Sequence, residues 1–523
     1  MGESQGNFFY FARIFSVSSE IIAKKTPIEN KMRQMFKRAL LTLSLAVASV
    51  SAFAGGYLTN TNQSVAFLRN PAQHAVIGIQ GAYSNPAGIG FMTEGWHFGV
   101  NAQTTWQKRI TNTTYGPFAY GDGNNGSTKK FTGNAFVPIN PSIDAAYVKG
   151  KWFGSFHFGI VSGGGKAEYD DGIASFETPV AALGAILVGA SSGAISGYAA
   201  DIDLTGQQYN YAGQINIGYR LNDHWSVSVG LRMNYVKNTY EGGLRNIQVN
   251  YGGTLLAASD VFSLFGLSSF SSLVEDKELD CVQTDLAWTP IIGVDFKTGK
   301  WNFAARYEFN TKVRLENDTD VNTTGIAQYD DEAVIANDIP ALLTLGAQFS
   351  PFEKWRISAG WNMYFDKQAN QYNSATGEND KTDYLDNNTW EANAGVEYDL
   401  SKLVTLSTGI NYSKYDAGTD GQYLSDISFN TTSFNWGLGA RFHLSDKVAI
   451  DVAWYHSFYS KYTKKQSDYG GYGATYTALI SSYASQLAAL GMDVSSLSSA
   501  DFSGSDQFTR KNDVIAIGLI LDL

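Results

Sequence analysis

The chain has 523 residues, 44% hydrophobic and 14% aromatic, with a formal net charge of −11 and a mean hydropathy of −0.18. This acidic balance argues against a nucleic-acid-binding protein, because affinity for phosphates depends on dense Lys and Arg patches. The hydrophobic content argues against a disordered chain, and the sequence lacks the repeated apolar runs of about 20 residues that a bundle of membrane helices requires.

The N-terminus carries the pattern of a secretory signal peptide. Basic residues precede the apolar stretch 39–50, which is followed by Ala52-Phe53-Ala54. A basic segment, a short apolar core and a small-x-small cleavage site are the features of an export signal, and this core is too short to span a bilayer of about 30 Å. We expect 35–54 to be the signal peptide and 1–34 to be an over-extended N-terminus. Removal of both segments leaves a net charge of −15.

Residues 55–94 show no long helical or strand period. They contain the tripeptide Asn-Pro-Ala twice, as Asn70-Pro71-Ala72 and Asn85-Pro86-Ala87. Proline fixes its own φ and moves the preceding residue away from the α region, so each Asn-Pro step predicts a turn. On these residues alone, two ordinary turns are the simplest interpretation.

From residue 95 onward the dominant hydropathy period is two, which is typical of strands. In 225–235, for example, one parity is apolar and the other polar. The same alternation predicts fourteen strands, at Trp96–Trp106, Ile143–Val148, Trp152–Val161, Gln207–Arg220, Trp225–Tyr235, Thr284–Phe296, Trp301–Asn310, Ala341–Phe349, Trp355–Asp366, Trp390–Leu400, Val404–Tyr412, Thr432–His443, Val448–Ser457 and Val514–Leu523.

The connections between these strands alternate strictly between short and long. The short turns lie near 149–151, 221–224, 297–300, 350–354, 401–402 and 444–447, and the long connections near 107–141, 162–206, 241–280, 311–339, 367–389, 413–427 and 458–509. An up-and-down barrel with short periplasmic turns and long extracellular loops gives this alternation and an even strand count. A soluble β-sandwich, the alternative, does not explain it. We therefore predict an all-β protein whose residues 95–523 form a 14-stranded antiparallel transmembrane β-barrel.

The tryptophans give an independent test of the barrel. By parity all eleven fall on the apolar face, and five of them begin strands that leave the short turns. Indole prefers the headgroup boundary of a bilayer, so this row predicts an aromatic girdle. A strand in lipid requires a closed sheet. The final strand ends on the apolar residue Leu523, which resembles the C-terminal signal read by barrel-assembly machinery. These features indicate the bacterial outer membrane, with its lipid and lipopolysaccharide as surroundings.

Several motifs resemble one family of outer-membrane proteins. The segment Ala82–Phe91, which contains the second Asn-Pro-Ala, is similar to the plug of the FadL/TodX family of transporters for long-chain fatty acids and hydrocarbons. Further blocks resemble the same family, at Gly164–Tyr169, Ala304–Tyr307, Lys312–Leu315 and Asp338–Gly346. The resemblance covers residues 55–523.

This resemblance implies a monomeric barrel closed by an N-terminal plug, here residues 55–94. It also implies an external groove that captures a hydrophobic ligand, an internal site, and lateral release through a kinked third strand. The third strand of this sequence permits such a kink, because glycine tolerates strained backbone. The glycines concerned are Gly159, Gly163, Gly164 and Gly165.

Three long loops are unusually apolar, at 178–199, 251–273 and 476–497, the last with the pattern of an amphipathic helix. Such patches mark either a self-packed cap or a ligand groove, and the sequence leaves both open. The candidate contacts in these loops are Leu183, Leu187, Phe262 and Phe265. Lumen-facing parity adds four cations that could hold a carboxylate or pair with lumen acids instead; they are Arg232, Arg306, Arg356 and Arg441.

No catalytic or metal-binding pattern stands out. The single cysteine, Cys281, is too little for a thiolate metal site, and the six histidines lack metal-ligand spacing. We expect no enzyme activity and no cofactor. The expected function is passive uptake of hydrophobic small molecules, with long-chain fatty acids as the leading class. The alternatives are a heme-binding receptor using a histidine such as His74, and a nonspecific porin or surface antigen.

Overall fold

The computed structural model describes residues 64–523 except 124–125, 192, 265–267, 374–377, 382–384, 422–423, 428, 483 and 490–500. Its main sheet contains 18 strand segments. Four of them are short segments that lie beside longer strands or continue them, namely β6, β9, β10 and β19. The barrel therefore has fourteen strands, as predicted. The segments are β1 (Gly95–Tyr115), β2 (Thr128–Lys149), β3 (Trp152–Tyr169), β4 (Ile195–Arg220), β5 (Trp225–Tyr251), β6 (Thr254–Ala257), β7 (Lys277–Thr298), β8 (Trp301–Glu308), β9 (Arg314–Asn322), β10 (Val334–Ala336), β11 (Leu342–Phe352), β12 (Trp355–Tyr364), β15 (Trp390–Asp399), β16 (Val404–Lys414), β17 (Ser433–His443), β18 (Val448–Tyr459), β19 (Tyr462–Gln466) and β20 (Gly504–Asp522).

The sheet closes because β1 pairs antiparallel with β20 along its length, from His97 opposite Asp522 to Tyr115 opposite Gly504. All other neighbours are also antiparallel. Successive side chains of a strand point to opposite faces, so one set fills the lumen and the other faces outward. In β5, for example, the side chain of Arg232 is buried whereas Leu231 is exposed.

The outer surface carries the predicted aromatic girdle. Eight of the eleven tryptophans are exposed and three are half-buried, so none lies in the lumen. Aromatic side chains contact one another at two levels of the barrel wall. One level lies near the short turns, where Trp152 contacts Tyr219, and the other lies nearer the long loops, where Trp436 contacts Trp454. Within the described part of the chain, no helix is long and apolar enough to cross a membrane.

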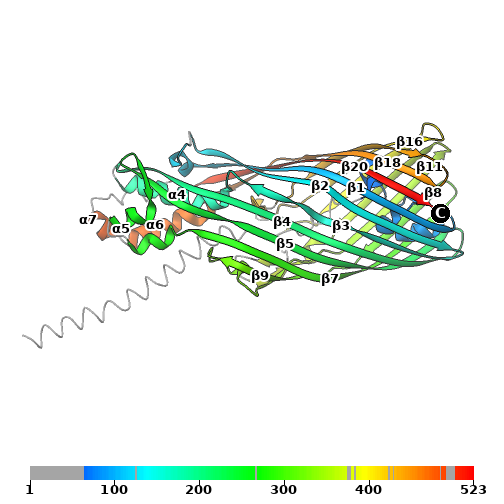
Figure 1. Ribbon diagram of the computed structural model, residues 1–523, viewed down its shortest axis with the longest axis horizontal. Coiled ribbons are helices and arrows are strands. Elements are labelled where there is room, and N and C mark those ends of the chain that lie inside the picture. Colours follow the sequence, from blue (N-terminus) through cyan, green and yellow to red (C-terminus); the bar gives the residue numbers. More distant parts are fainter. Residues whose placement is uncertain are drawn as a thin grey trace, which may run out of the picture.

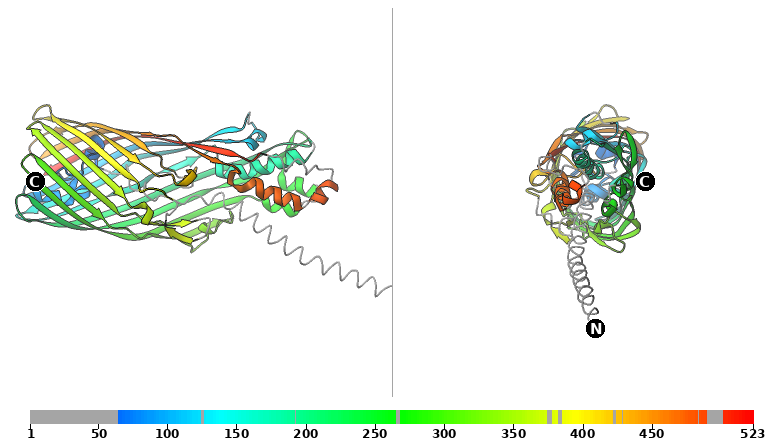
Figure 2. Two further views of the ribbon diagram at one scale, coloured as in Figure 1. Left: turned by 180° about the vertical axis from the view of Figure 1, so that it is seen from behind. Right: turned by 90° about the vertical axis from the view of Figure 1, so that its left-hand side faces the viewer.

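The short connections lie at the end of the barrel that holds the C-terminus, and the long ones lie at the opposite end (Figure 1). The first long connection was predicted over 107–141, but most of it is strand, because β1 and β2 continue as a paired hairpin beyond the aromatic girdle. Beyond the aromatic girdle both faces of the hairpin carry polar residues, so the alternation of apolar and polar residues does not predict these strand ends. Helices gather at the long-loop end (Figure 2): α4 (Ala174–Ala190), α5 (Ala258–Leu264), α6 (Tyr472–Ser482) and α7 (Ala484–Ala489).

The chain before β1 lies inside the barrel near the short turns (Figure 1). It forms the short helices α2 (Val65–Arg69) and α3 (Gly81–Ser84) and the 3₁₀ helix η2 (Pro86–Phe91). Most of its residues are buried. We call residues 64–94 the plug. The predicted signal peptide, the segment 1–34 and residues 55–63 lie outside the described residues.

Candidate functional site

The second Asn-Pro-Ala motif fixes the plug to the barrel wall. The side-chain oxygen of Asn85 accepts a hydrogen bond from the Gly88 amide at 3.3 Å and thereby caps η2, which begins at Pro86. Its side-chain nitrogen donates to Asp295 on β7 at 2.6 Å. Asn302 on β8 donates to the same carboxylate and to the Ala75 carbonyl of the plug. The motif is therefore both a turn and an anchor.

The first Asn-Pro-Ala motif packs against glycines of the wall. The side-chain oxygen of Asn70 accepts a hydrogen bond from the Ala72 amide, which closes a turn around Pro71. A Cβ atom at Gly395 would lie 1.8 Å from that oxygen, and one at Gly409 would lie 2.8 Å from Pro71. The plug therefore approaches the backbone of β15 and β16 more closely than any residue with a side chain would allow.

An arginine of the plug joins a buried charge cluster. The Arg69 guanidinium lies 2.7 Å from Glu397 and 3.5 Å from Asp451, and both of these acids also pair with wall arginines. Arg356 bonds Glu397 at 3.1 Å, and Arg441 bonds Asp451 at 2.7 Å. Arg69 is thus the plug's contribution to an alternating row of charges on β12, β15, β17 and β18.

Tyr83, just before the second motif, packs against two arginines of the barrel wall. Its ring lies 4.9 Å from the Arg232 guanidinium carbon and 5.6 Å from that of Arg306, which are cation–π distances. Arg306 also donates to the Tyr83 carbonyl. Both arginines bond one carboxylate, that of Glu308, at 2.7 and 3.1 Å. Two positive charges therefore share one negative charge at this point.

The four arginines selected by parity all lie inside the barrel, as expected, and each has a carboxylate partner. In this structure the four arginines therefore pair with acids of the lumen, which is one of the two roles considered for them. Arg306 differs from the others in one respect, because its buried Nε atom has no acceptor among the described residues. It also lines a small internal cavity of about 50 Å³ together with Tyr83, His74 and Leu342. Ligand contact by any of the four remains a prediction.

Directly beside this charge group the lumen is apolar. One cluster of buried residues from eight strands and two adjoining connections packs against Tyr83, and we call it the lumen cluster; its members are Val161, Ala212, Val236, Ala287, Val313, Leu315, Ile335, Ile339, Leu342 and Tyr364. A polar lumen is the usual content of a bacterial barrel, so an apolar belt next to a plug is a departure that suits a hydrophobic ligand.

The wall is interrupted where β2 meets β3. Their ladder is regular from Lys149–Trp152 to Ser142–Gly159 and resumes only at Ala135–Ala167. Between these points β2 contains Pro138 and Pro141, which have no amide hydrogen to donate. The facing part of β3 contains Val161, a member of the lumen cluster. A residue of the lumen cluster therefore lies in the part of β3 that has no partner on β2.

The glycines of β3 shape this interruption. Gly163 and Gly165 have φ values of 73° and 94°, and the pairing of β3 with β4 shifts register at both. Gly159 closes the regular part of the ladder. These register shifts lie where the kink is predicted, in a strand that also contains Gly164, and a lateral exit there stays a prediction. The side chain of Val137 on β2 would lie 2.8 Å from a Cβ atom at Gly165, so Val137 packs across the gap from the β2 side.

The apolar loops form a cap at the long-loop end. Leu183 and Leu187 of α4 and Phe262 of α5 are buried in one cluster that also contains residues of α6 and of the 3₁₀ helix η3 (Gly116–Tyr120). These contacts are those of a self-packed cap. Phe265 lies outside the described residues. Of the helix predicted over 476–497, α6 and α7 cover the described part.

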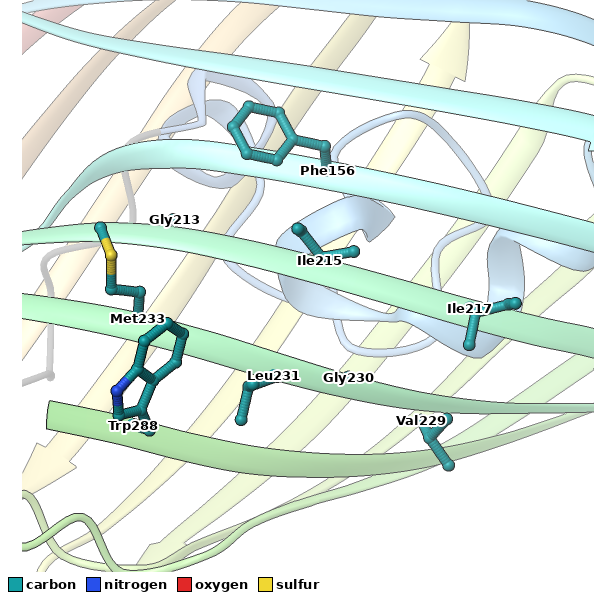
Figure 3. Close-up of a pocket in the computed structure, with 9 residues that line it drawn as sticks. All are labelled: Phe156, Gly213, Ile215, Ile217, Val229, Gly230, Leu231, Met233 and Trp288. Atoms are coloured by element: carbon teal, nitrogen blue, oxygen red, sulfur yellow. The ribbon is translucent and has the colours of Figure 1, made fainter.

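The outer face of β3, β4, β5 and β7 carries an apolar groove of about 560 Å³ (Figure 3). Phe156, Ile215, Leu231 and Trp288 border it, and Gly213 leaves it open because a Cβ there would meet nothing within 4 Å. The groove reaches β3 at Phe156, in the regular part of the β2–β3 ladder.

His74, the histidine named in the heme-binding alternative, is buried in the plug. Its ring accepts or donates one hydrogen bond with Asn362 at 3.1 Å and lies against Gly346 and Gly360 of the wall. Burial, assisted by the nearby Arg306 charge, lowers the pKa of His74 to about 4. No group of three or more metal-binding side chains occurs in the described ranges.

Sequence reasoning missed Arg69 and Tyr83 as elements of this site, and it placed Asp295 in the lumen without its plug partner. A signal existed for the first two, because Arg69 directly precedes Asn70-Pro71 and Tyr83 lies two residues before Asn85. Asp295 is 210 residues from its plug partner, and only the register of the closed sheet brings the two together.

Comparisons with known proteins agree with this geometry. The family model described as outer membrane protein transport protein (OMPP1/FadL/TodX) matches residues 195–495. A crystal structure of a Pseudomonas aeruginosa FadL homologue is 12% identical, with 89% of this chain and 99% of that chain covered and a TM-score of 0.57. The TodX monoaromatic hydrocarbon channel deltaS2 mutant is 15% identical, with 89% and 100% covered and a TM-score of 0.52. No curated protein sequence matches significantly.

Proposed function

Because the chain belongs to the OMPP1/FadL/TodX family of outer-membrane transport proteins, which carry hydrophobic small molecules, we propose that its substrates are long-chain fatty acids. The protein resides in the bacterial outer membrane. The proposed path begins under the extracellular cap, passes the lumen cluster above the plug and leaves sideways through the interrupted β2–β3 ladder.

The observation that carries the substrate proposal is the neighbourhood of Arg306. Two guanidinium groups share the Glu308 carboxylate, and the buried Nε of Arg306 has no acceptor in the described part of the chain. A ligand carboxylate would complete this arrangement, because charge-assisted hydrogen bonds are the strong ones. The adjacent lumen cluster would take the acyl chain, whose burial contributes about 0.8 kcal/mol per methylene group.

The lateral exit is supported by the same cluster, since Val161 belongs both to it and to the part of β3 that lacks a partner on β2. An apolar ligand that leaves there enters the membrane without crossing water. The groove on the membrane face reaches the same strand at Phe156.

Ligand binding to purified protein tests the substrate class. We expect Arg306→Gln to weaken oleate binding about tenfold, because one charge-assisted hydrogen bond contributes about 1.5–3 kcal/mol, and to leave toluene binding unchanged. Arg220→Gln, at an exposed short turn, is the matched control. Equal loss for both ligands, or preference for toluene in the unmodified protein, would contradict a fatty-acid anchor. A large steady ion conductance in planar bilayers would favour the porin alternative.

A further inference from the structure

Four lysines point outward from neighbouring strands just beyond the aromatic girdle on the extracellular side. Lys108 lies on β1, Lys130 on β2, Lys465 on β19 and Lys511 on β20, and all four are exposed. Each alternates with an inward-facing neighbour, as Lys511 does with the buried Asn512. We call these residues the lysine row.

Two members of the row face each other. Lys108 is paired directly with Lys511 across the β1–β20 ladder. Like charges opposite one another on the same face of a sheet are destabilising, unless an anion lies between them. The nearest outward acid, Asp513, is bonded to His456 at 2.6 Å, and none of the four lysines forms an ion pair with a described residue.

The depth of the row is set by the aromatic residues below it. Trp106, 44% exposed, lies two residues before Lys108 on β1 and faces the same way. Two residues span about 6.6 Å along a strand, which is about 5 Å along the membrane normal at the usual barrel tilt of about 40°. Indole rings lie at the headgroup boundary, so Lys108 and Lys511 lie at the level of the lipid headgroups, and Lys130 and Lys465 lie farther out.

The charge is segregated around the rim. On β9 the outward positions carry acids instead, Glu316, Asp318 and Asp320, and all three are exposed. The whole chain carries a net charge of −11. A row of lysines without acidic partners on β19, β20, β1 and β2 is therefore a local feature and not a general property of the surface.

We propose that the lysine row binds the phosphate groups of lipopolysaccharide, with Lys108 and Lys511 holding a lipid A phosphate. Several observations meet at this surface: the cross-strand lysine pair, its height at the headgroups of the outer leaflet, and the hydrocarbon-facing aromatics Trp106 and Phe136 directly below it. Phosphate oxygens accept charge-assisted hydrogen bonds from ammonium groups, and the aromatic side chains contact the acyl chains of the same lipid.

Native mass spectrometry of the full-length protein in detergent tests the proposal, with deep-rough lipopolysaccharide as the probe. We expect the unmodified protein to hold one lipid, and Lys108→Gln combined with Lys511→Gln to weaken binding at least tenfold. Added NaCl should also weaken binding, because exposed charges are screened. The matched control is Lys237→Gln combined with Lys414→Gln, which removes two exposed charges from β5 and β16.

The thermal midpoint of each variant verifies that the barrel is folded. Three results would overturn the proposal: unchanged binding by the Lys108/Lys511 variant, equal loss in the control variant, or equal affinity for lipid A without phosphates. Equal affinity for phosphatidylglycerol would likewise overturn it, because it would show a general response to anionic headgroups.

Discussion

The ring of Tyr83 lies 4.7 Å from the imidazole of His157, measured between ring centroids. Tyr83 belongs to the plug, whereas His157 lies on β3 two residues before Gly159, the last regular pair beside the interrupted ladder. His157 is itself bonded to Asp144 of β2 at 2.8 Å. A single plug residue therefore contacts the arginine pair on one side and the border of the proposed lateral exit on the other.

We expect Tyr83→Ala to loosen the plug, because it removes a ring that packs on two guanidinium groups and one imidazole. Truncation of a fully buried aromatic side chain costs about 3–5 kcal/mol, and the loss for the half-buried Tyr83 should be smaller. In planar bilayers the variant should show frequent conducting openings. Tyr83→Phe retains the ring and should behave like the unmodified protein. A closed Tyr83→Ala channel would show that Tyr83 does not hold the plug.

The interrupted ladder can be blocked from the lumen side. Val137 packs across the gap toward Gly165, so we expect Val137→Trp to fill it and reduce cellular uptake of labelled oleate at least tenfold without reducing oleate binding. Ile143→Trp is the matched control, since Ile143 faces outward in the paired part of the same strand. Unchanged uptake with Val137→Trp would rule out this exit.

The fourteen strands were predictable because membrane strands must present alternate faces to lipid and lumen. Their extensions were not, since the hairpin of β1 and β2 beyond Trp106 carries polar residues on both faces and shows no period. Likewise, β4 begins at Ile195, well before the predicted Gln207.

The site was only partly predictable. Parity placed Arg232 and Arg306 in the lumen, but their shared partner Glu308 follows from sheet register. The turn at Asn85 was visible in the sequence, whereas its bond to Asp295 was not. Apolar loop residues such as Leu183 and Leu187 allowed two interpretations, and only tertiary contacts show that they pack within the cap.

Burial should decide how much an arginine with two acidic partners contributes to stability. Arg69 is 3% exposed beside Glu397 and Asp451. Both acids keep a wall arginine in Arg69→Ala, so we expect this substitution to cost about 1.5–3 kcal/mol, the contribution of a hydrogen bond to a charged group. A lower thermal midpoint and ion leakage should follow.

Arg245 is the control for Arg69. It bridges Asp203 and Glu278 at 2.5 and 2.9 Å but is 36% exposed, and exposed pairs contribute about 0–1 kcal/mol. Arg245→Ala should therefore leave the midpoint nearly unchanged. Equal shifts for both variants would argue against a special role of the plug contact.

Substitution of a wall glycine by alanine should disturb the plug only where the plug lies against that glycine. A Cβ at Gly437 would lie 2.1 Å from the Leu68 carbonyl oxygen of α2, so we expect Gly437→Ala to displace this helix and accelerate hydrogen exchange of residues 65–69. Gly213→Ala is the control, because its Cβ would project into the open groove. Equal exchange rates in the two variants would contradict a close contact between α2 and Gly437.

The plug should become less firmly seated in acid. The pKa of His74 is lowered from 6.5 to about 4 by burial, so the seated plug keeps the ring neutral while the released plug takes up a proton. The stabilisation is complete above pH 6.5 and falls as the pH drops toward 4, by about 1.4 kcal/mol per unit and about 3 kcal/mol in total. Hydrogen-exchange protection of the plug, corrected for intrinsic rates, should therefore decrease between pH 7.5 and 5. His74→Gln retains a hydrogen-bonding side chain for Asn362 and should abolish this dependence, whereas His224→Gln, at an exposed turn, should preserve it. A pH dependence that survives in His74→Gln would assign the effect to another group.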